Sequence, residues 1–158
     1  MNKSIKIYQD SIFKDKRGFY WTSWKKNRYK KLIFNHDKFS LSKKNTLRGI
    51  HGDTKTWKLM TCVYGKVFFV AINNVKKSKF FMKHKTFILS HSNNKSILIP
   101  PNYGIGFFCL SKYCVMFYKL SYKGKYNDIK KQFTIKWNDI RHKIKWPLGR
   151  KILSKRDA

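Results

Sequence analysis

Short runs of hydrophobic side chains, bounded by polar and turn-forming residues, recur along the whole chain. Four runs rich in β-branched and aromatic residues predict strands, at residues 67–72, 96–99, 115–118 and 133–137. Gly, Pro, Asn and Ser predict the turns between them, at residues 64–66, 73–74, 92–94, 100–104 and 123–124. Many short strands at roughly even spacing predict an all-β sandwich or jelly roll. With no internal repeat or linker, we expect one domain over residues 1–158.

One short segment has a helical pattern instead. Residues 23–32 place Trp24, Tyr29 and Leu32 at spacings that let all three face inward. The sequence therefore predicts one short helix beside the strands.

The composition indicates a folded and very basic protein. Of 158 residues, 42% are hydrophobic and 17% aromatic, which is too many for a disordered tail. The net charge of +30 comes from 31 lysines and 6 arginines against 7 aspartates, with no glutamate. Such a charge suggests a polyanion such as nucleic acid. However, the lysines are spread along the chain and arginine is scarce, so a lysine-rich coding bias is favoured over a nucleic-acid partner.

The cysteines and the N-terminal segment suggest a location. Cys62, Cys109 and Cys114 form no C-x-x-C pair, and their strand-like neighbours predict buried, reduced thiols. Lysines interrupt residues 1–16, so no secretory hydrophobic segment is predicted there. The longest apolar run, residues 67–72, is too short to span a bilayer. We expect a cytoplasmic, soluble protein.

The residues around His51 are the first candidates for chemistry. Arg48 and His51 are three apart, so a regular strand would direct them to opposite faces. Gly49 could mark a bulge that turns both inward. A surface arginine beside a buried structural histidine is the simpler interpretation, and both stay open.

Other kinds of site find little support. The five histidines contain no H-x-H pair and glutamate is absent, so no metal centre is expected. There is no G-x-S-x-G elbow and no glycine-rich phosphate loop. Aromatic residues and lysines alternate over residues 113–126, which is typical of a surface that stacks single-stranded nucleic acid, or of a strand with an aromatic inner face.

The order of several motifs is more informative than any one of them. The chain resembles the dTDP-4-dehydrorhamnose 3,5-epimerase family from about Phe13 to Asp157, with a Gly52-Asp53 pair more like the relatives that act on heptose and capsule-type sugars. The matching motifs are DKRGFY at 15–20, SKKNTLRGIH at 42–51, WKL at 57–59, GKVF at 65–68, IPP at 99–101, GF at 106–107, WND at 137–139, IKWP at 144–147 and LSKRD at 153–157.

The resemblance implies a cupin-like jelly-roll barrel of antiparallel strands that acts as a homodimer on a nucleotide-diphosphate sugar, without metal or cofactor. Such enzymes belong to rhamnose, lipopolysaccharide or capsule biosynthesis. His51 would remove a proton beside the C4 ketone, Asp157 would orient it, and Lys58 would stabilise the enolate oxygen. Tyr118 would return a proton to the opposite face.

The resemblance also implies which residues bind the substrate. Five positions match family contacts, with Arg17 and Phe19 reaching in from a partner subunit: Arg17, Phe19, Arg48, Gln132 and Arg156.

Several positions depart from the family pattern. They are Thr22 and Gln132 in place of Glu, His36 and Lys38 in place of the ends of Q-D-N, Phe69 in place of Asp, and Ile105 in place of His. These substitutions leave the proposed chemical groups intact and change mainly the pocket wall. They leave open an altered sugar or nucleotide, inversion at C3, C5 or both, or a poorly active copy.

The sequence leaves two alternative functions. One is a C3-only epimerase or a 3,4-ketoisomerase, although ketoisomerases typically carry an H-x-H-like pair that His51-Gly52-Asp53 lacks. The other is a non-catalytic basic protein that binds nucleic acid with steep salt dependence.

Overall fold

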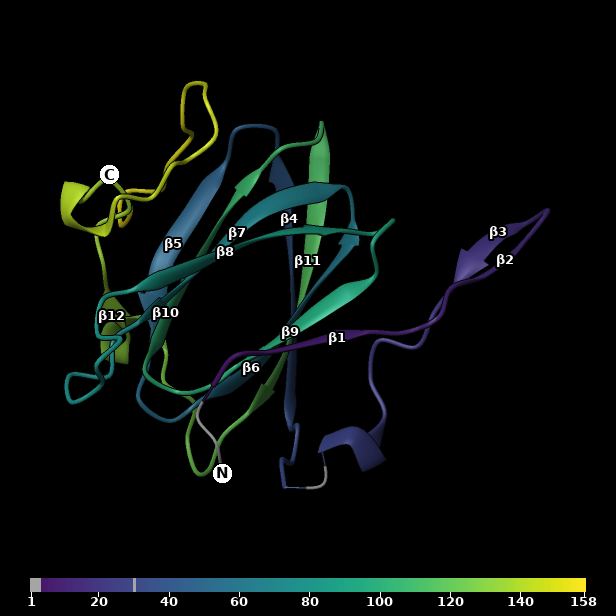
Figure 1. The fold of residues 1–158 in the computed structure, drawn as a ribbon, viewed down its shortest axis with the longest axis horizontal. Coiled ribbons are helices and arrows are strands. Elements are labelled where there is room, and N and C mark those ends of the chain that lie inside the picture. The colour runs from purple at the N-terminus through teal and green to yellow at the C-terminus, as the bar shows by residue number, and fades with distance from the viewer. Residues whose placement is uncertain (1–3, 30) are drawn as a thin grey trace.

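The computed structural model describes residues 4–29 and 31–158, which form two five-stranded sheets and a separate hairpin (Figure 1). The first sheet has the order β1–β9–β6–β11–β4, the second has the order β12–β5–β10–β7–β8, and all neighbours are antiparallel. The strands are β1 (Lys6–Gln9), β2 (Phe13–Asp15), β3 (Gly18–Tyr20), β4 (His36–Lys43), β5 (Leu47–Gly52), β6 (Trp57–Tyr64), β7 (Lys66–Asn73), β8 (His84–Ser90), β9 (Lys95–Ile99), β10 (Tyr103–Cys109), β11 (Tyr113–Ser121) and β12 (Phe133–Thr134). The predicted all-β, antiparallel jelly roll is confirmed.

The four predicted strands are found, but with different bounds. β7 and β9 extend one residue beyond the prediction at one or both ends, and β11 covers Tyr113–Ser121 where 115–118 was expected. The strand expected at 133–137 ends at Thr134, because the chain turns where the amide of Asp139 donates to the carbonyl of Lys136. The turn expected at 100–104 is shorter, because Tyr103 already pairs with Asn73 as the first residue of β10.

The helical prediction was correct in place but wrong in type and number. Residues 26–29 form a 3-10 helix, η1 (Lys26–Tyr29), and the described residues contain two more, η2 (Ile129–Lys131) and η3 (Ile140–His142). Tyr29 is buried, and Trp24 and Leu32 pack against its cluster, so the predicted inward face is confirmed.

The main core lies between the two sheets and consists of side chains from strands of both. Met60 and Met116 of the first sheet pack with Phe69 and Phe107 of the second, and all four are fully or almost fully buried. Cys62, Cys109 and Cys114 belong to the same core and form no disulfide, as the sequence predicted. The core reaches the cavity described below, so one face of it carries the site.

The C-terminal tail is held against the second sheet. Backbone hydrogen bonds join Ile152 to Asn45 and Leu47 beside β5, at 2.9 and 3.0 Å. Trp146 packs edge-on against Phe68 of β7, with ring centroids 5.6 Å apart. The tail therefore ends beside β5, whereas the β2–β3 hairpin projects from the other end of the molecule (Figure 1).

Candidate functional site

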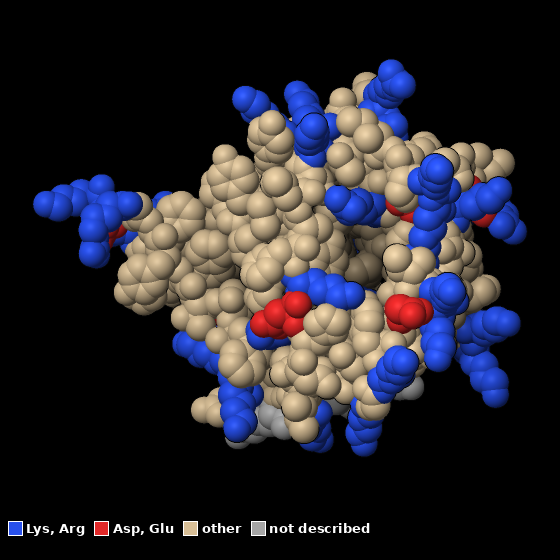
Figure 2. All heavy atoms as spheres, turned by 180° about the vertical axis from the view of Figure 1, so that it is seen from behind, with Lys and Arg blue, Asp and Glu red and all other residues tan. Residues whose placement is uncertain are grey.

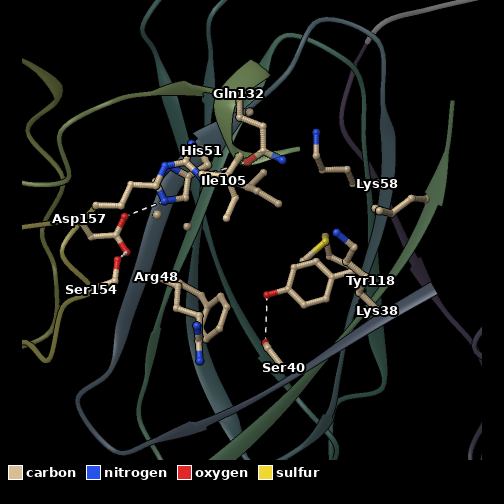
Figure 3. A pocket seen from close by; sticks show the side chains of 18 of the residues that line it. Lys38, Ser40, Arg48, His51, Lys58, Ile105, Tyr118, Gln132, Ser154 and Asp157 are labelled. Atoms are coloured by element: carbon tan, nitrogen blue, oxygen red, sulfur yellow. Dashed lines mark hydrogen bonds and ion pairs between the residues drawn. The ribbon is translucent and has the colours of Figure 1, made fainter. Parts of the chain in front are cut away.

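A cavity of about 580 Å³ opens between the sheets and is closed on one side by the C-terminal tail. Strands of both sheets line it, together with residues 154–157 (Figure 3). Its lining combines polar side chains with several apolar ones. The apolar members include Met60, Phe69, Ile105, Phe107 and Leu120.

A bulge at Gly49 brings Arg48 and His51 to the same cavity. Arg48 pairs with Phe107 and His51 with Ile105, so two residues of β5 lie opposite one of β10. Gly49 has a φ of 115°, and a Cβ there would lie 2.6 Å from the Cα of Gly106. The bulge hypothesis is confirmed, since both side chains line the cavity.

His51 makes its closest polar contact with Asp157. The Nε2 atom of His51 lies 2.6 Å from Oδ1 of Asp157, whose side chain is 4% exposed. Ser154 donates to the other carboxylate oxygen at 2.9 Å. On the far side of the ring, Nδ1 lies 3.2 Å from Oγ1 of Thr134, which also accepts from Arg156 at 3.1 Å. The tail thus brings a nearly buried carboxylate to the histidine.

Burial lowers the pKa of His51, and the charge of Arg156 lowers it further. The Asp157 carboxylate opposes this shift only in part. His51 is therefore neutral near pH 7, and a neutral imidazole can accept a proton.

Tyr118 lies across the cavity from His51 (Figure 3). It belongs to β11, and its hydroxyl forms a 3.1 Å hydrogen bond with Oγ of Ser40 on β4. Burial raises the pKa of Tyr118, although Ser40 and the charge of Arg48 lower it in part. The phenol therefore remains protonated at neutral pH and can donate.

Lys58 lies in the cavity wall on β6 and is 5% exposed. Its Nζ donates to Oδ2 of Asp53 at 2.8 Å. The arrangement places a buried cation in a largely apolar lining, where it can stabilise negative charge.

The predicted binding residues fall into two groups. Arg48, Gln132 and Arg156 line the cavity, and Arg156 donates to Oε1 of Gln132 at 3.2 Å. Arg17 and Phe19 do not line it; they lie on the projecting β2–β3 hairpin, where Arg17 pairs with Asp15 of the same hairpin. Within one chain the site is therefore without the two residues expected from a partner subunit.

The positions that depart from the family pattern also fall into two groups, inside and outside the cavity lining. Lys38, Phe69 and Ile105 line the cavity. His36 instead contacts the hydroxyl of Tyr122, and Thr22 is not among the lining residues.

Sequence reasoning missed four polar residues around these groups. Thr134, Ser154 and Ser40 contact His51, Asp157 and Tyr118, and Asp53 contacts Lys58. Ser154 lies in the quoted LSKRD motif, which was its only signal in the sequence. Asp53 was quoted as half of the Gly52-Asp53 pair, but without a role. Thr134 and Ser40 have no signal, because their contacts depend on pairing between strands.

The basic residues do not gather at one place on the face drawn in Figure 2. Lysine and arginine side chains project around its whole outline, and a hollow opens among them (Figure 2).

Within residues 4–29 and 31–158, no group of three or more His, Cys or Asp residues has a metal-binding arrangement. No helix in the described part of the chain is long and apolar enough to cross a membrane.

Solved structures share this fold. An epimerase of Legionella pneumophila in complex with dTDP-4-keto-L-rhamnose superposes with a TM-score of 0.90 at 33% identity, over 97% of this chain and 84% of that one. A dTDP-4-dehydrorhamnose 3,5-epimerase of Bacillus anthracis with TDP and pyrophosphate bound gives 0.90 at 28% identity, over 99% and 93%.

The sequence comparisons agree. The dTDP-4-dehydrorhamnose 3,5-epimerase of Salmonella typhimurium is 34% identical over 98% of this chain and 87% of its own length. That of Escherichia coli K12 is 32% identical over 92% and 81%. The profile of this family matches residues 3–158. The chain belongs to the dTDP-4-dehydrorhamnose 3,5-epimerase family.

Proposed function

We propose that this protein epimerises a nucleotide-diphosphate-linked 4-keto-6-deoxy sugar, with a dTDP sugar as the first candidate, at C3, C5 or both. The observation that carries the proposal is the His51–Asp157 contact on one side of the cavity with Tyr118 on the other. Membership of the family supports the substrate class. We further propose that residues 1–158 act as one catalytic domain.

His51 takes the proton from the carbon beside the C4 ketone. Asp157 Oδ1 lies 2.6 Å from Nε2 of His51, so the carboxylate orients the ring and stabilises the imidazolium that results. The bonding electrons move onto the ketone oxygen and form an enolate. Lys58 stabilises this oxygen by charge, so the scheme has no step for a metal ion or cofactor.

Tyr118 completes the inversion. It donates its proton to the same carbon from the opposite face, which inverts the stereocentre. Tyr118 then recovers a proton from solvent, and His51 releases the one it took. Ser40 holds its hydroxyl toward the cavity. Arg48, Gln132 and Arg156 would bind the sugar and the diphosphate, because arginine recognises phosphate with paired donors.

We propose that the working form is a homodimer that shares residues between sites. The side chain of Arg17 is 81% exposed, and Phe13 and Tyr20 of the same hairpin are more than half exposed. Exposed apolar residues also mark the outer strand β4, where Phe39 stacks on Phe117. A second copy that covers these surfaces would bring Arg17 and Phe19 to its partner's cavity.

Mixing two inactive variants tests this sharing. His51→Ala and Arg17→Ala are each expected to lose activity, and a heterodimer of the two contains one intact site. Random exchange at equal amounts should recover about a quarter of the wild-type rate. No recovery from a mixture that light scattering shows to be dimeric would contradict shared sites.

The proposed location is the cytoplasm. Three buried, unpaired thiols in one core support a reducing compartment.

Solvent deuterium exchange tests the proposed activity. The wild type and His51→Ala are incubated in D₂O with 4-keto-6-deoxy sugars linked to dTDP, GDP or UDP, and NMR follows C3 and C5. We expect exchange by the wild type alone, with at least one nucleotide. Exchange confined to C3 would make it a C3-only enzyme. No exchange above background with any of these sugars would refute the proposal.

A further inference from the structure

Lys58 has a buried carboxylate partner to which the proposed reaction gives no role. Asp53 lies in the loop between β5 and β6 and is 1% exposed. Its Oδ2 accepts from Nζ of Lys58 at 2.8 Å. Among the described residues that line the cavity, Asp157 is the one carboxylate, and it contacts His51. The charge of Lys58 is therefore balanced from outside the cavity lining, by Asp53.

The backbone fixes the Asp53 carboxylate in place. Its Oδ1 accepts from the amides of Lys55 at 3.0 Å and Thr56 at 2.7 Å. Its own carbonyl accepts from the amide of Asn102 at 2.8 Å. Two amide hydrogen bonds to the carboxylate and one to its own backbone carbonyl keep it from moving to follow a flexible lysine. The position of Oδ2 therefore determines where the ammonium lies.

The pair also determines the charge of Lys58. Burial lowers the pKa of Lys58, and the Asp53 carboxylate opposes this shift by its charge and its hydrogen bond. For Asp53, burial raises the pKa, but the charge and hydrogen bond of Lys58 and the hydrogen bonds from Thr56 and Lys55 lower it overall. Without the carboxylate, a lysine this deeply buried would lose its proton more readily.

The other charged or titratable groups at this end are few. Tyr126 lines the cavity near Asp53, and the Nζ of Lys38 on β4 lies 4.1 Å above its ring. Tyr118 lies on β11, the strand that pairs with β6 beside Lys58. The position where the family pattern has an aspartate is Phe69, which adds no charge. None of these groups replaces the negative charge of Asp53.

We propose that Asp53 is a positioning residue that keeps Lys58 protonated and holds its ammonium beside the place where the enolate oxygen forms. This inference rests on the proposed function, in which Lys58 stabilises that oxygen. Lys58 has three N–H donors; Asp53 takes one, and the carbonyl of Thr56 takes a second at 3.5 Å. The ammonium therefore keeps one donor for the substrate while its charge and direction are fixed.

The variant Asp53→Asn isolates the effect of the Asp53 charge on Lys58. It keeps an Oδ1 for the amides of Lys55 and Thr56 and replaces only the oxygen that faces Lys58 with an NH₂ group. The alkaline limb of the kcat profile should shift to lower pH by at least about one unit, with KM nearly unchanged. The matched control is Asp37→Asn, which breaks an exposed pair with Lys119 outside the cavity lining and should leave the profile as in the wild type.

A direct titration needs no substrate. The ¹⁵Nζ signal of Lys58 is assigned by its loss in Lys58→Arg and followed against pH in the wild type and in Asp53→Asn. A lower Lys58 pKa in the variant supports the inference, and equal pKa values with equal alkaline limbs would overturn it. If Asp53→Asn does not fold, the test uses the wild type alone. The ¹³C carboxyl shift of Asp53 should then change at the pH where Lys58 loses its proton. An Asp53 signal that does not respond to the titration of Lys58 overturns the inference.

These outcomes separate the two proposals. A wild type that exchanges no sugar refutes the proposed function, whatever the lysine titration gives. A wild type that exchanges, with an Asp53→Asn variant unchanged in both profiles, refutes only the role of Asp53.

Discussion

Replacing Asp157 with Asn should slow proton abstraction strongly while it leaves the shape of the tail almost unchanged. Asp157 is the carboxylate in contact with His51, at 2.6 Å, and it accepts from Ser154 through the other oxygen. When His51 takes the proton, an imidazolium forms beside this carboxylate. The variant therefore loses an attraction that exists in full only as the transition state is approached.

The size of the effect follows from the geometry. Two unit charges with centres about 4 Å apart interact by about 4 kcal/mol at an effective dielectric constant of about 20. Since 1.36 kcal/mol corresponds to a tenfold change in rate, kcat should fall by roughly 10³-fold. The side chains are only 4% and 21% exposed, so solvent screens the pair little. This figure is an upper estimate, because Asn still offers a carbonyl oxygen.

The assay is deuterium exchange into a dTDP-linked 4-keto-6-deoxy sugar, with Asp37→Asn as the matched carboxylate-to-amide control. The acid limb of kcat/KM should also move to lower pH in Asp157→Asn, because the carboxylate raises the pKa of His51. Exchange within about threefold of the wild type, with an unmoved acid limb, would refute the assigned role.

Three further expectations concern pH, the bulge and the phenol. The active form needs neutral His51 and protonated Lys58, and burial lowers the pKa of both side chains. The acid limb of the pH–rate profile should therefore lie below pH 6.5 and its alkaline limb below pH 10.5. An acid limb above pH 6.5 would contradict this. Gly49→Ala should destabilise the fold by about 1–3 kcal/mol or more and so lower the thermal midpoint, because Gly49 has a positive φ and lies close to the backbone of Gly106. An unchanged melting curve would show that the bulge is not constrained. Ser40→Ala should reduce kcat by about tenfold through a neutral hydrogen bond and leave KM nearly constant, and an effect on KM alone would argue against an orienting role.

The sequence predicted the parts of the fold that local pattern determines. Buried strands such as β7 carry a continuous apolar run, so their existence follows from residue type alone. The ends of β12 and β10 depend on turns closed by distant hydrogen bonds, and local pattern does not report these. The 3-10 helices η2 and η3 are too short to leave a helical period, whereas η1 lies in the one segment that has such a pattern.

For the site, the motif order pointed to His51, Lys58, Tyr118 and Asp157, but not to the contacts that bring them together. Asp157 is near the C-terminus, where a free end would be the ordinary expectation, and its place beside His51 depends on the pairing of Ile152 with the edge of β5. Asp53 reaches Lys58 only because of one loop conformation. Such contacts between segments distant in the sequence become visible only in the folded structure.

The central claim is that His51 and Tyr118 move protons on opposite faces of one carbon. The most direct test is to run the wild type and Tyr118→Phe in D₂O with a dTDP-linked 4-keto-6-deoxy sugar, and to read deuterium content and configuration at C3 and C5 from the same NMR spectra. The wild type should put solvent deuterium on the inverted carbon, and Tyr118→Phe should exchange the proton but no longer invert the centre. Inversion without solvent deuterium, or full inversion by Tyr118→Phe, would contradict the account.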